Sequence, residues 1–166
     1  MVLDPVMVAT SGDRLLHADA IETLQRDLLP LATIVTPNLP EAALLTGLPI
    51  ADTEAEITRQ AEMILKAGAK AVLIKGGHGD GPQSTDYLFA DGTVQALSAM
   101  RVDTKNDHGT GCTLAAAITA HLAMGHNLAE AVGLAKDYLN GALDAGRGLA
   151  VGHGRGPVHH FYRWWG

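Results

Sequence analysis

Cysteine and basic residues are both scarce in this sequence. Its 166 residues include one cysteine, Cys112, and 12 Lys and Arg against 18 Asp and Glu, for a net charge of −6. A single cysteine cannot form an internal disulfide, so we expect a reducing compartment, the cytoplasm. Because the basic residues form no cluster, we expect no nucleic-acid partner.

Long apolar runs and aromatic residues are also rare. No apolar run approaches the roughly 20 residues that a membrane-spanning helix needs, so no membrane partner is expected. Aromatic residues make up 4% of the chain and hydrophobic residues 47%. Ala, Leu, Ile and Val must therefore fill the core. The length predicts a single domain, residues 1–166, since domains commonly hold roughly 100–200 residues.

Strand and helix patterns alternate along the first half of the chain. Short apolar runs predict strands at residues 1–7, 31–36 and 69–75, and a helical period separates them. Capping-box spacing marks three helix starts: Asp19/Glu22, Thr53/Glu56 and Asn127/Glu130. Asp91-Gly92 predicts a β-hairpin turn. The predicted fold class is therefore α/β, a mostly parallel sheet flanked by helices with a hairpin at one edge.

A glycine-rich turn leads into a predicted helix near residue 112. Gly109, Thr110 and Gly111 precede Cys112 and a run of strong helix formers. The start of a helix presents unpaired backbone N–H groups and the positive end of the helix dipole, which together favour an anion. We therefore predict an anion site here, most plausibly for a phosphoryl group, with Cys112 in or beside the first turn.

Polar residues follow each predicted strand. Asp4 follows the first, Asn38 and Glu41 the second, and Lys75 the third. In an open α/β sheet, ligands bind outside the carboxyl ends of the strands. An acid, an amide with an acid, a cation and an anion site are the groups that bind a nucleotide phosphate with a divalent cation.

Each of these residues also has a purely structural interpretation. Asn38 and Glu41 have N-cap and N3 spacing and would cap a helix. Asp4 before Pro5 is a common turn choice, and Lys75 would be a solvated charge. A lone cysteine is most often a small buried hydrophobe.

Six blocks that occur in order carry a resemblance to a known family. They are Leu3-Asp4-Pro5-Val6-Met7, Ser11-Gly12-Asp13, Thr36-Pro37-Asn38-Leu39-Pro40-Glu41-Ala42, Lys75-Gly76-Gly77-His78, Thr104-Lys105-Asn106 with His108-Gly109-Thr110-Gly111-Cys112-Thr113, and Gly156-Pro157-Val158-His159-His160. Together they resemble the hydroxymethylpyrimidine/phosphomethylpyrimidine kinases of thiamine biosynthesis, which are ribokinase-like. The match is to the C-terminal part of that family. We therefore expect the N-terminal part of the fold, with much of the pyrimidine pocket, to be missing.

The resemblance implies an activity and its cofactors. The family uses ATP and Mg²⁺ to phosphorylate 4-amino-5-hydroxymethyl-2-methylpyrimidine and then its monophosphate. Gly109, Thr110 and Gly111 would line the anion site for the transferred phosphoryl group. Cys112 stands where sugar kinases of the superfamily carry a catalytic Asp, and would accept the substrate proton or hold the phosphate.

The resemblance also implies metal and nucleotide contacts. Asn38 and Glu41 would organise Mg²⁺ through water, and Asp4 and Lys75 would lie at the ATP phosphates. Four further residues would border the nucleotide base: Thr104, Lys105, Asn106 and Lys136. The full-length family implies a homo-oligomer, a dimer.

Three alternatives stay open. The chain could be a catalytically incompetent nucleotide-binding fragment, or a pyridoxal-type kinase. It could also be a hydrolase that uses Cys112 with His108, although no third orienting group is evident. Asp107 departs from the family pattern, which often has a hydroxyl residue there. A carboxylate beside an anion site should weaken phosphate binding unless it points to solvent.

Overall fold

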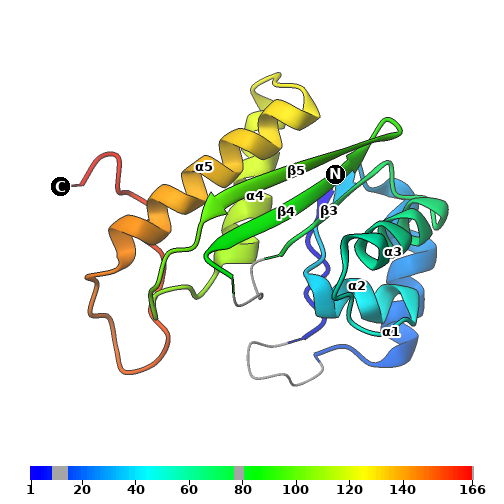
Figure 1. Cartoon of the computed structure of the whole chain (residues 1–166), viewed down its shortest axis with the longest axis horizontal. Helices are drawn as coiled ribbons and strands as arrows, with labels where there is room; N and C mark the ends of the chain where they lie inside the picture. The colour runs from blue at the N-terminus through cyan, green and yellow to red at the C-terminus, as the bar shows by residue number, and fades with distance from the viewer. Residues whose placement is uncertain (9–14, 77–80, 166) are drawn as a thin grey trace. The chain divides into compact units, whose positions relative to one another are not determined.

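The computed structural model describes residues 1–8, 15–76 and 81–165. Its contacts divide the chain into two compact units, Met1–Ser98 and Ala99–Gly166 (Figure 1). The block Ser11-Gly12-Asp13 and the pair Gly77-His78 lie outside the described residues.

A mixed sheet organises the first unit. In the described residues it has five strands in the order β1-β2-β3-β4-β5. They are β1 (Val2–Leu3), β2 (Ile34–Val35), β3 (Ala71–Ile74), β4 (Gln83–Ala90) and β5 (Thr93–Met100), which runs on into the second unit. The pairs β1–β2 and β2–β3 are parallel and β3–β4 is antiparallel. The predicted parallel sheet with a hairpin at one edge is therefore confirmed.

Three helical segments accompany this sheet (Figure 1). α1 (Ala18–Thr23) continues as a π-helical turn, η1 (Leu24–Leu28), and a 3₁₀ turn, η2 (Leu29–Leu31). α2 (Leu39–Thr46) packs against α3 (Glu54–Lys66), and α3 packs against β3. Apolar side chains from all these elements form one core, which includes the fully buried Met7, Val35, Val72 and Ile74. Burial of this kind stabilises the fold by roughly 1.5–3 kcal/mol per large side chain.

The helix starts show where local sequence patterns suffice. Capping boxes at Thr53/Glu56 and Asn127/Glu130 are present as predicted. The prediction at Asp19/Glu22 was wrong, because the N-cap is His17 and its side chain makes no capping hydrogen bond. Asp19 instead lies in the first turn. A carboxylate is favourable there as well, so the same residue type fits both positions.

Two long helices are the main elements of the second unit. α4 (Thr110–Ala123) and α5 (Leu128–Gly146) pack closely against each other. Leu114 and Ile118 of α4 and Val132 of α5 are buried, as is Val158 of the C-terminal segment. A short β-bridge between His108 and Pro157 joins that segment to the loop that leads into α4.

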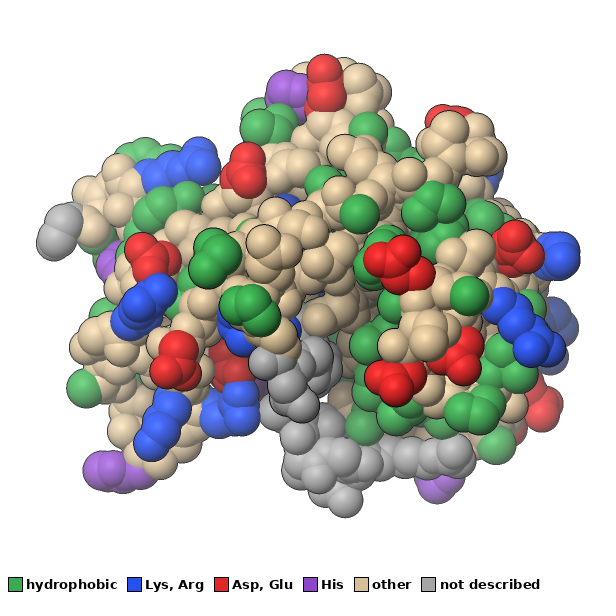
Figure 2. Space-filling model, in the orientation of Figure 1, with side chains coloured by type: hydrophobic (Ala, Val, Ile, Leu, Met, Phe, Trp, Pro, Cys, Tyr) green, Lys and Arg blue, Asp and Glu red, His purple; other side chains and the backbone are tan. Residues whose placement is uncertain are grey.

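Charged side chains are mixed on the surface. On the face shown in Figure 2, Lys and Arg side chains alternate with Asp and Glu. Within the part of the chain that the structure describes, no helix is long and apolar enough to span a membrane.

Candidate active site

Three charged residues meet at the carboxyl ends of the parallel strands. Asp4 follows β1, Lys75 follows β3, and Glu41 lies in the first turn of α2, which starts just after β2. The Lys75 Nζ atom donates to Asp4 Oδ1 at 2.8 Å and lies 3.9 Å from Glu41 Oε2. A backbone bond from Lys75 N–H to Pro37 O, at 2.9 Å, holds the ends of β2 and β3 together. The structure therefore brings together residues that the sequence places as far as 71 positions apart.

Glu41 and Asn38 form a capping box at the start of α2. The Asn38 N–H donates to Glu41 Oε2 at 2.7 Å, and the Glu41 N–H donates to Asn38 Oδ1 at 2.8 Å. The capping interpretation is therefore confirmed. It does not exclude a further role, since the same Glu41 carboxylate faces Lys75.

Burial sets the acidity of Glu41, which is only 3% exposed. Burial raises the pKa of its carboxyl above the ordinary value, because desolvation disfavours the charged form. The positive charge of Lys75 and the N–H groups of Asn38 and Met7 lower the pKa but do not cancel this effect. Lys75 and the two N–H groups therefore offset only part of the effect of burial on the Glu41 carboxyl.

Thr36 belongs to this cluster, although its sequence position does not indicate it. It follows β2 directly, is completely buried, and its hydroxyl donates to Asp4 Oδ1 at 3.1 Å. Asp4 Oδ1 thus accepts from both Thr36 and Lys75. In the sequence Thr36 ends a β-branched run and looks like one more strand residue.

The second predicted centre lies at the start of α4, in the second unit. Gly109 is the N-cap and has φ +83°, a conformation that favours glycine. Among the described residues, no partner is found for the backbone N–H groups of Gly111 and Cys112, whereas Thr113 N–H bonds to Gly109 O. Cys112 is exposed, so the interpretation as a buried hydrophobe was wrong.

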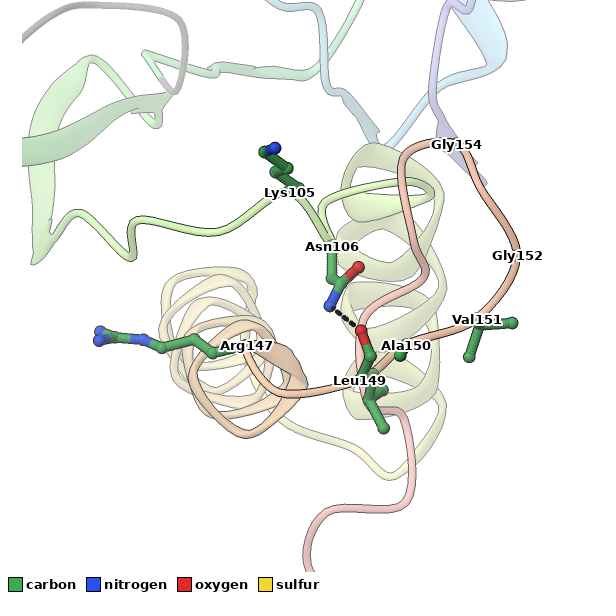
Figure 3. A pocket seen from close by; sticks show the side chains of 8 residues that line it. All are labelled: Lys105, Asn106, Arg147, Leu149, Ala150, Val151, Gly152 and Gly154. Atoms are coloured by element: carbon green, nitrogen blue, oxygen red, sulfur yellow. Dashed lines mark hydrogen bonds between the residues drawn. The ribbon is translucent and has the colours of Figure 1, made fainter.

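A pocket of about 280 Å³ lies beside the segment that precedes α4 (Figure 3). Lys105 and Asn106 line it together with Arg147, residues 149–152 and Gly154. The buried Asn106 amide donates to Leu149 O at 2.8 Å and to Gly146 O at 2.6 Å. Its side chain therefore shapes the pocket by holding the loop after α5.

A second pocket of about 360 Å³ adjoins Lys105. Thr104, His153, Gly154 and Arg155 complete its lining. Lys136, the fourth residue predicted near the base, is buried in α5 and lines neither of these two pockets.

Asp107 is paired with Arg155. The Arg155 Nε donates to Asp107 Oδ1 at 2.7 Å, and Nη2 donates to Oδ2. Sequence reasoning missed Arg155, which lies 48 positions away in a segment without periodicity. Asp107 therefore has a cationic partner that the sequence did not indicate.

The residues that the structure describes contain no evident cluster of direct metal ligands. Within them, no group of three or more His, Cys, Asp or Glu side chains is arranged to hold a metal ion. Asn38 Oδ1 is committed to the cap of α2. The role of Asn38 in organising Mg²⁺ through water, which the family resemblance implies, stays a prediction.

Comparison with known proteins decides the family. Residues 1–159 match the family described as phosphomethylpyrimidine kinase. The chain belongs to the phosphomethylpyrimidine kinase family. A hydroxymethylpyrimidine/phosphomethylpyrimidine kinase of Rhizobium meliloti is 60% identical over 164 residues, 99% of this chain and 62% of that protein. The corresponding Escherichia coli kinase is 51% identical over 165 residues, which are 99% of this chain and 62% of that protein.

Solved structures agree with this assignment to the phosphomethylpyrimidine kinases. A Staphylococcus aureus pyridoxal kinase in complex with ADP has a TM-score of 0.88 at 38% identity, over 98% of this chain and 59% of that chain. The same enzyme is known with AMP-PCP and pyridoxal. A Clostridium difficile phosphomethylpyrimidine kinase has a TM-score of 0.71 at 41% identity, over 86% of this chain and 56% of that chain. The ribokinase-like fold is therefore confirmed, and the chain spans about 60% of the length of these relatives.

Proposed function

We propose that this chain carries the phosphoryl-transfer part of a kinase for 4-amino-5-hydroxymethyl-2-methylpyrimidine and its monophosphate. The observation that carries the proposal is the cluster of Asp4, Glu41 and Lys75 at the carboxyl ends of β1 to β3. Ligands of open α/β sheets bind at this edge. The names of the relatives at 51–60% identity supply the substrate.

ATP is the proposed phosphoryl donor. Lys75 contacts its phosphates as a point charge, and Asp4 lies near the same phosphates. Support comes from the burial of Lys75, whose side chain is only 14% exposed, because water weakens the field of a shielded ammonium group less than that of an exposed one. Thr104, Lys105, Asn106 and Lys136 border the nucleotide base, with Asn106 acting through the shape of the pocket.

Mg²⁺ is the proposed metal, organised through water by Asn38 and Glu41. Oxygen ligands with several retained waters suit this ion. When bound, it neutralises charge on the transferring phosphoryl group. The carboxylate of Glu41, kept close to Lys75, supplies the negative charge that attracts it.

Gly109, Thr110 and Gly111 form the proposed anion hole for the transferred group. The open N–H groups at the start of α4 support this role. Cys112 accepts the proton of the substrate hydroxyl as that oxygen attacks the γ-phosphorus and ADP leaves. In the other variant of the proposal, the Cys112 thiol holds the phosphate. The reaction takes place in the cytoplasm, in a homodimer.

One experiment tests the proposal in two arms. Calorimetry measures ADP binding to this chain, and a coupled assay measures ADP release with the pyrimidine alcohol. The assay is run with and without a polypeptide for the part of the R. meliloti kinase that the chain does not match. We expect ADP binding in both cases and turnover at least with the added polypeptide. ADP binding without pyrimidine-dependent turnover in either case would establish a non-catalytic nucleotide-binding fragment instead.

Pyridoxal phosphorylation is the second candidate function. The fold similarity to a pyridoxal kinase, with a TM-score of 0.88, is the observation that favours it. Acceptor competition separates the two: the pyrimidine alcohol should have the higher kcat/KM, and a preference for pyridoxal would reverse the assignment.

A further inference from the structure

Asp86 is a buried carboxylate that the proposed reaction does not use. It lies in β4 and is only 6% exposed. Side chains two positions apart in a strand share a face, and Leu88, two positions further on, belongs to the core. An apolar side chain would therefore suit position 86. A carboxylate buried there is costly unless it is paired or hydrogen-bonded, so the bonds that it makes bear on its role.

Asp86 accepts a backbone N–H just beyond the end of β3, the neighbour of β4 (Figure 1). The last pair in the ladder between β3 and β4 is Ile74 with Tyr87. Two residues later along the chain, the Gly76 N–H donates to Asp86 Oδ1 at 2.9 Å. The two segments are so close here that a Cβ at Gly76 would collide with Thr85 O. The carboxylate therefore extends the contact between the two strands beyond their backbone ladder.

This bond holds the backbone on one side of Lys75. On the other side, the Lys75 N–H donates to Pro37 O, just after β2, at 2.9 Å. Lys75 is thus fastened toward β2 through its own N–H and toward β4 through the N–H of Gly76. From this backbone, Lys75 Nζ reaches Asp4 Oδ1 at 2.8 Å and lies 3.9 Å from Glu41 Oε2.

The place of the Lys75 ammonium group depends on this backbone. Lysine carries its charge on a flexible four-carbon stem, so a shift at the base of the side chain moves the charge. A misplacement of about 1 Å in a positioning contact can lower an activity about 10²-fold. A side chain that fixes the chain next to Lys75 therefore affects what Lys75 binds.

We propose that Asp86 is a positioning residue that holds Lys75 at the phosphate site by fixing the Gly76 N–H. The inference rests on the proposed function, in which Lys75 contacts the phosphates of ATP. In this role Asp86 does not contact the nucleotide. Its effect requires a hydrogen-bond acceptor at position 86 rather than a charge, and it disappears when Lys75 is replaced.

Two variants of similar size test the need for an acceptor. Asp86→Asn keeps an oxygen that accepts the Gly76 N–H, whereas Asp86→Leu fills the same space without one. Both remove the charge, so the difference between them isolates the hydrogen bond. In calorimetry of AMP-PCP with Mg²⁺, Asp86→Leu should bind about three- to tenfold more weakly than wild type, and Asp86→Asn at least about as tightly. In a Lys75→Met background, Asp86→Leu should cause no further loss.

A second measurement needs no ligand. In a chain with carbon-13-labelled lysine, NMR detects the Cε signal of Lys75, which is assigned from its absence in Lys75→Arg. Asp86→Leu should shift this signal, because the ammonium group moves relative to Asp4, and Asp86→Asn should leave it in place.

Gln60→Leu is the matched control. It also removes a bond of a buried side chain in the first unit, from Gln60 Nε2 to Pro49 O. It should change neither the Lys75 signal nor AMP-PCP binding. Urea denaturation checks that each variant is folded, and Asp86→Ala, which also lacks the acceptor, replaces Asp86→Leu if the latter does not fold.

Three outcomes would overturn the inference. They are equal losses of affinity in Asp86→Leu and Asp86→Asn, a Lys75 signal that stays in place in Asp86→Leu, and the same loss of affinity with and without Lys75. The last would show that Asp86 acts on the site only through general stability. A wild-type chain that binds no AMP-PCP overturns the proposed function instead, and the lysine signal then still decides whether Asp86 positions Lys75.

Discussion

Single side chains in the Asp4–Glu41–Lys75 cluster owe their properties to their neighbours. Glu41 and Glu56 are both N3 residues of capping boxes, yet their environments are opposite. Burial raises the pKa of Glu41, whereas hydrogen bonds from Asp52 and Thr53 lower the pKa of the exposed Glu56. Position in a motif therefore does not fix the behaviour of a carboxyl group.

This contrast predicts opposite pH dependences of stability. The folded state holds the Glu41 proton more tightly than the unfolded state, because the folded pKa is raised above the ordinary value of 4.5. As the pH rises above 4.5, ionisation of Glu41 therefore lowers the free energy of unfolding. The free energy of unfolding of Glu41→Gln should therefore rise relative to that of wild type as the pH increases above 4.5. Glu56→Gln should have a lower free energy of unfolding than wild type once the pH is high enough for Glu56 to ionise. The reason is that a carboxyl whose pKa is lower in the folded state stabilises the fold at pH values above its unfolded pKa.

Urea denaturation at several pH values, with EDTA present, measures both differences. If the free energy of unfolding changes with pH in the same way in wild type and Glu41→Gln, burial does not raise the pKa of Glu41.

The two proposed roles of Cys112 predict different kinetic changes. If the thiol accepts the substrate proton, Cys112→Ala should lower kcat by about 10²–10⁴-fold and leave ATP affinity nearly unchanged. If it only holds the transferred phosphoryl group, ATP affinity should fall with a modest change in kcat. Steady-state kinetics of the complemented protein, with calorimetry of the non-hydrolysable analogue AMP-PCP, distinguish the two. Unchanged turnover in Cys112→Ala would exclude a proton acceptor.

Sequence reasoning reached some of these residues and not others, for a physical reason. Asp4, Glu41 and Lys75 each follow a predicted strand, and parallel strands bring such positions to one edge. Thr36 resembles an ordinary strand residue, and only the three-dimensional structure reveals its bond to Asp4. Arg155 lies in a segment with no period, so nothing local indicates its partner.

Helix starts are the elements on which sequence and structure agree best, since a capping box is a contact over three residues. Strand lengths agree less well. Residues 1–7 and 31–36 were predicted as strands, but β1 and β2 each pair over only two residues. An apolar run shows that a segment is buried, whereas its pairing depends on distant residues.

The cap of α2 predicts a separable pair of effects. Asn38→Ala should lower the free energy of unfolding by about 1 kcal/mol, because the Glu41 N–H loses its acceptor. It should also raise the Mg²⁺ concentration needed for tight ADP binding. Thr53→Ala is the matched control, since it removes the equivalent cap of α3. It should cost similar stability and leave the Mg²⁺ dependence alone.

Urea denaturation and Mg²⁺ titrations of ADP binding measure these effects. If Asn38→Ala changes stability only, the capping role is the whole role of Asn38.

At the scale of the whole molecule, the α/β class and the family followed from the sequence. Ordered blocks spread over the chain specify a family because they fix many positions at once. The prediction of a single domain stays a prediction, since the contacts show two compact units, each with its own packing. Packing between distant segments is not encoded in any local pattern.

The free edge of β1 predicts self-association of the chain. Among the described residues, β1 pairs with β2 alone. Large apolar side chains next to these strands are exposed: Met1 at 52%, Val6 at 44% and Leu31 at 65%. An open strand edge beside apolar surface recruits another chain. We therefore expect concentration-dependent dimers or larger species in sedimentation velocity at micromolar concentrations.

Two substitutions locate the contact. Val6→Lys with Leu31→Lys should shift the distribution toward monomer without changing the far-UV circular dichroism, because Lys at an exposed edge opposes association. Met124→Lys is the control, since Met124 is 65% exposed at the end of α4. It should leave association as in wild type. An equal effect of Met124→Lys would place the contact away from β1, and a wild-type chain that stays monomeric throughout would show that this edge recruits no second copy.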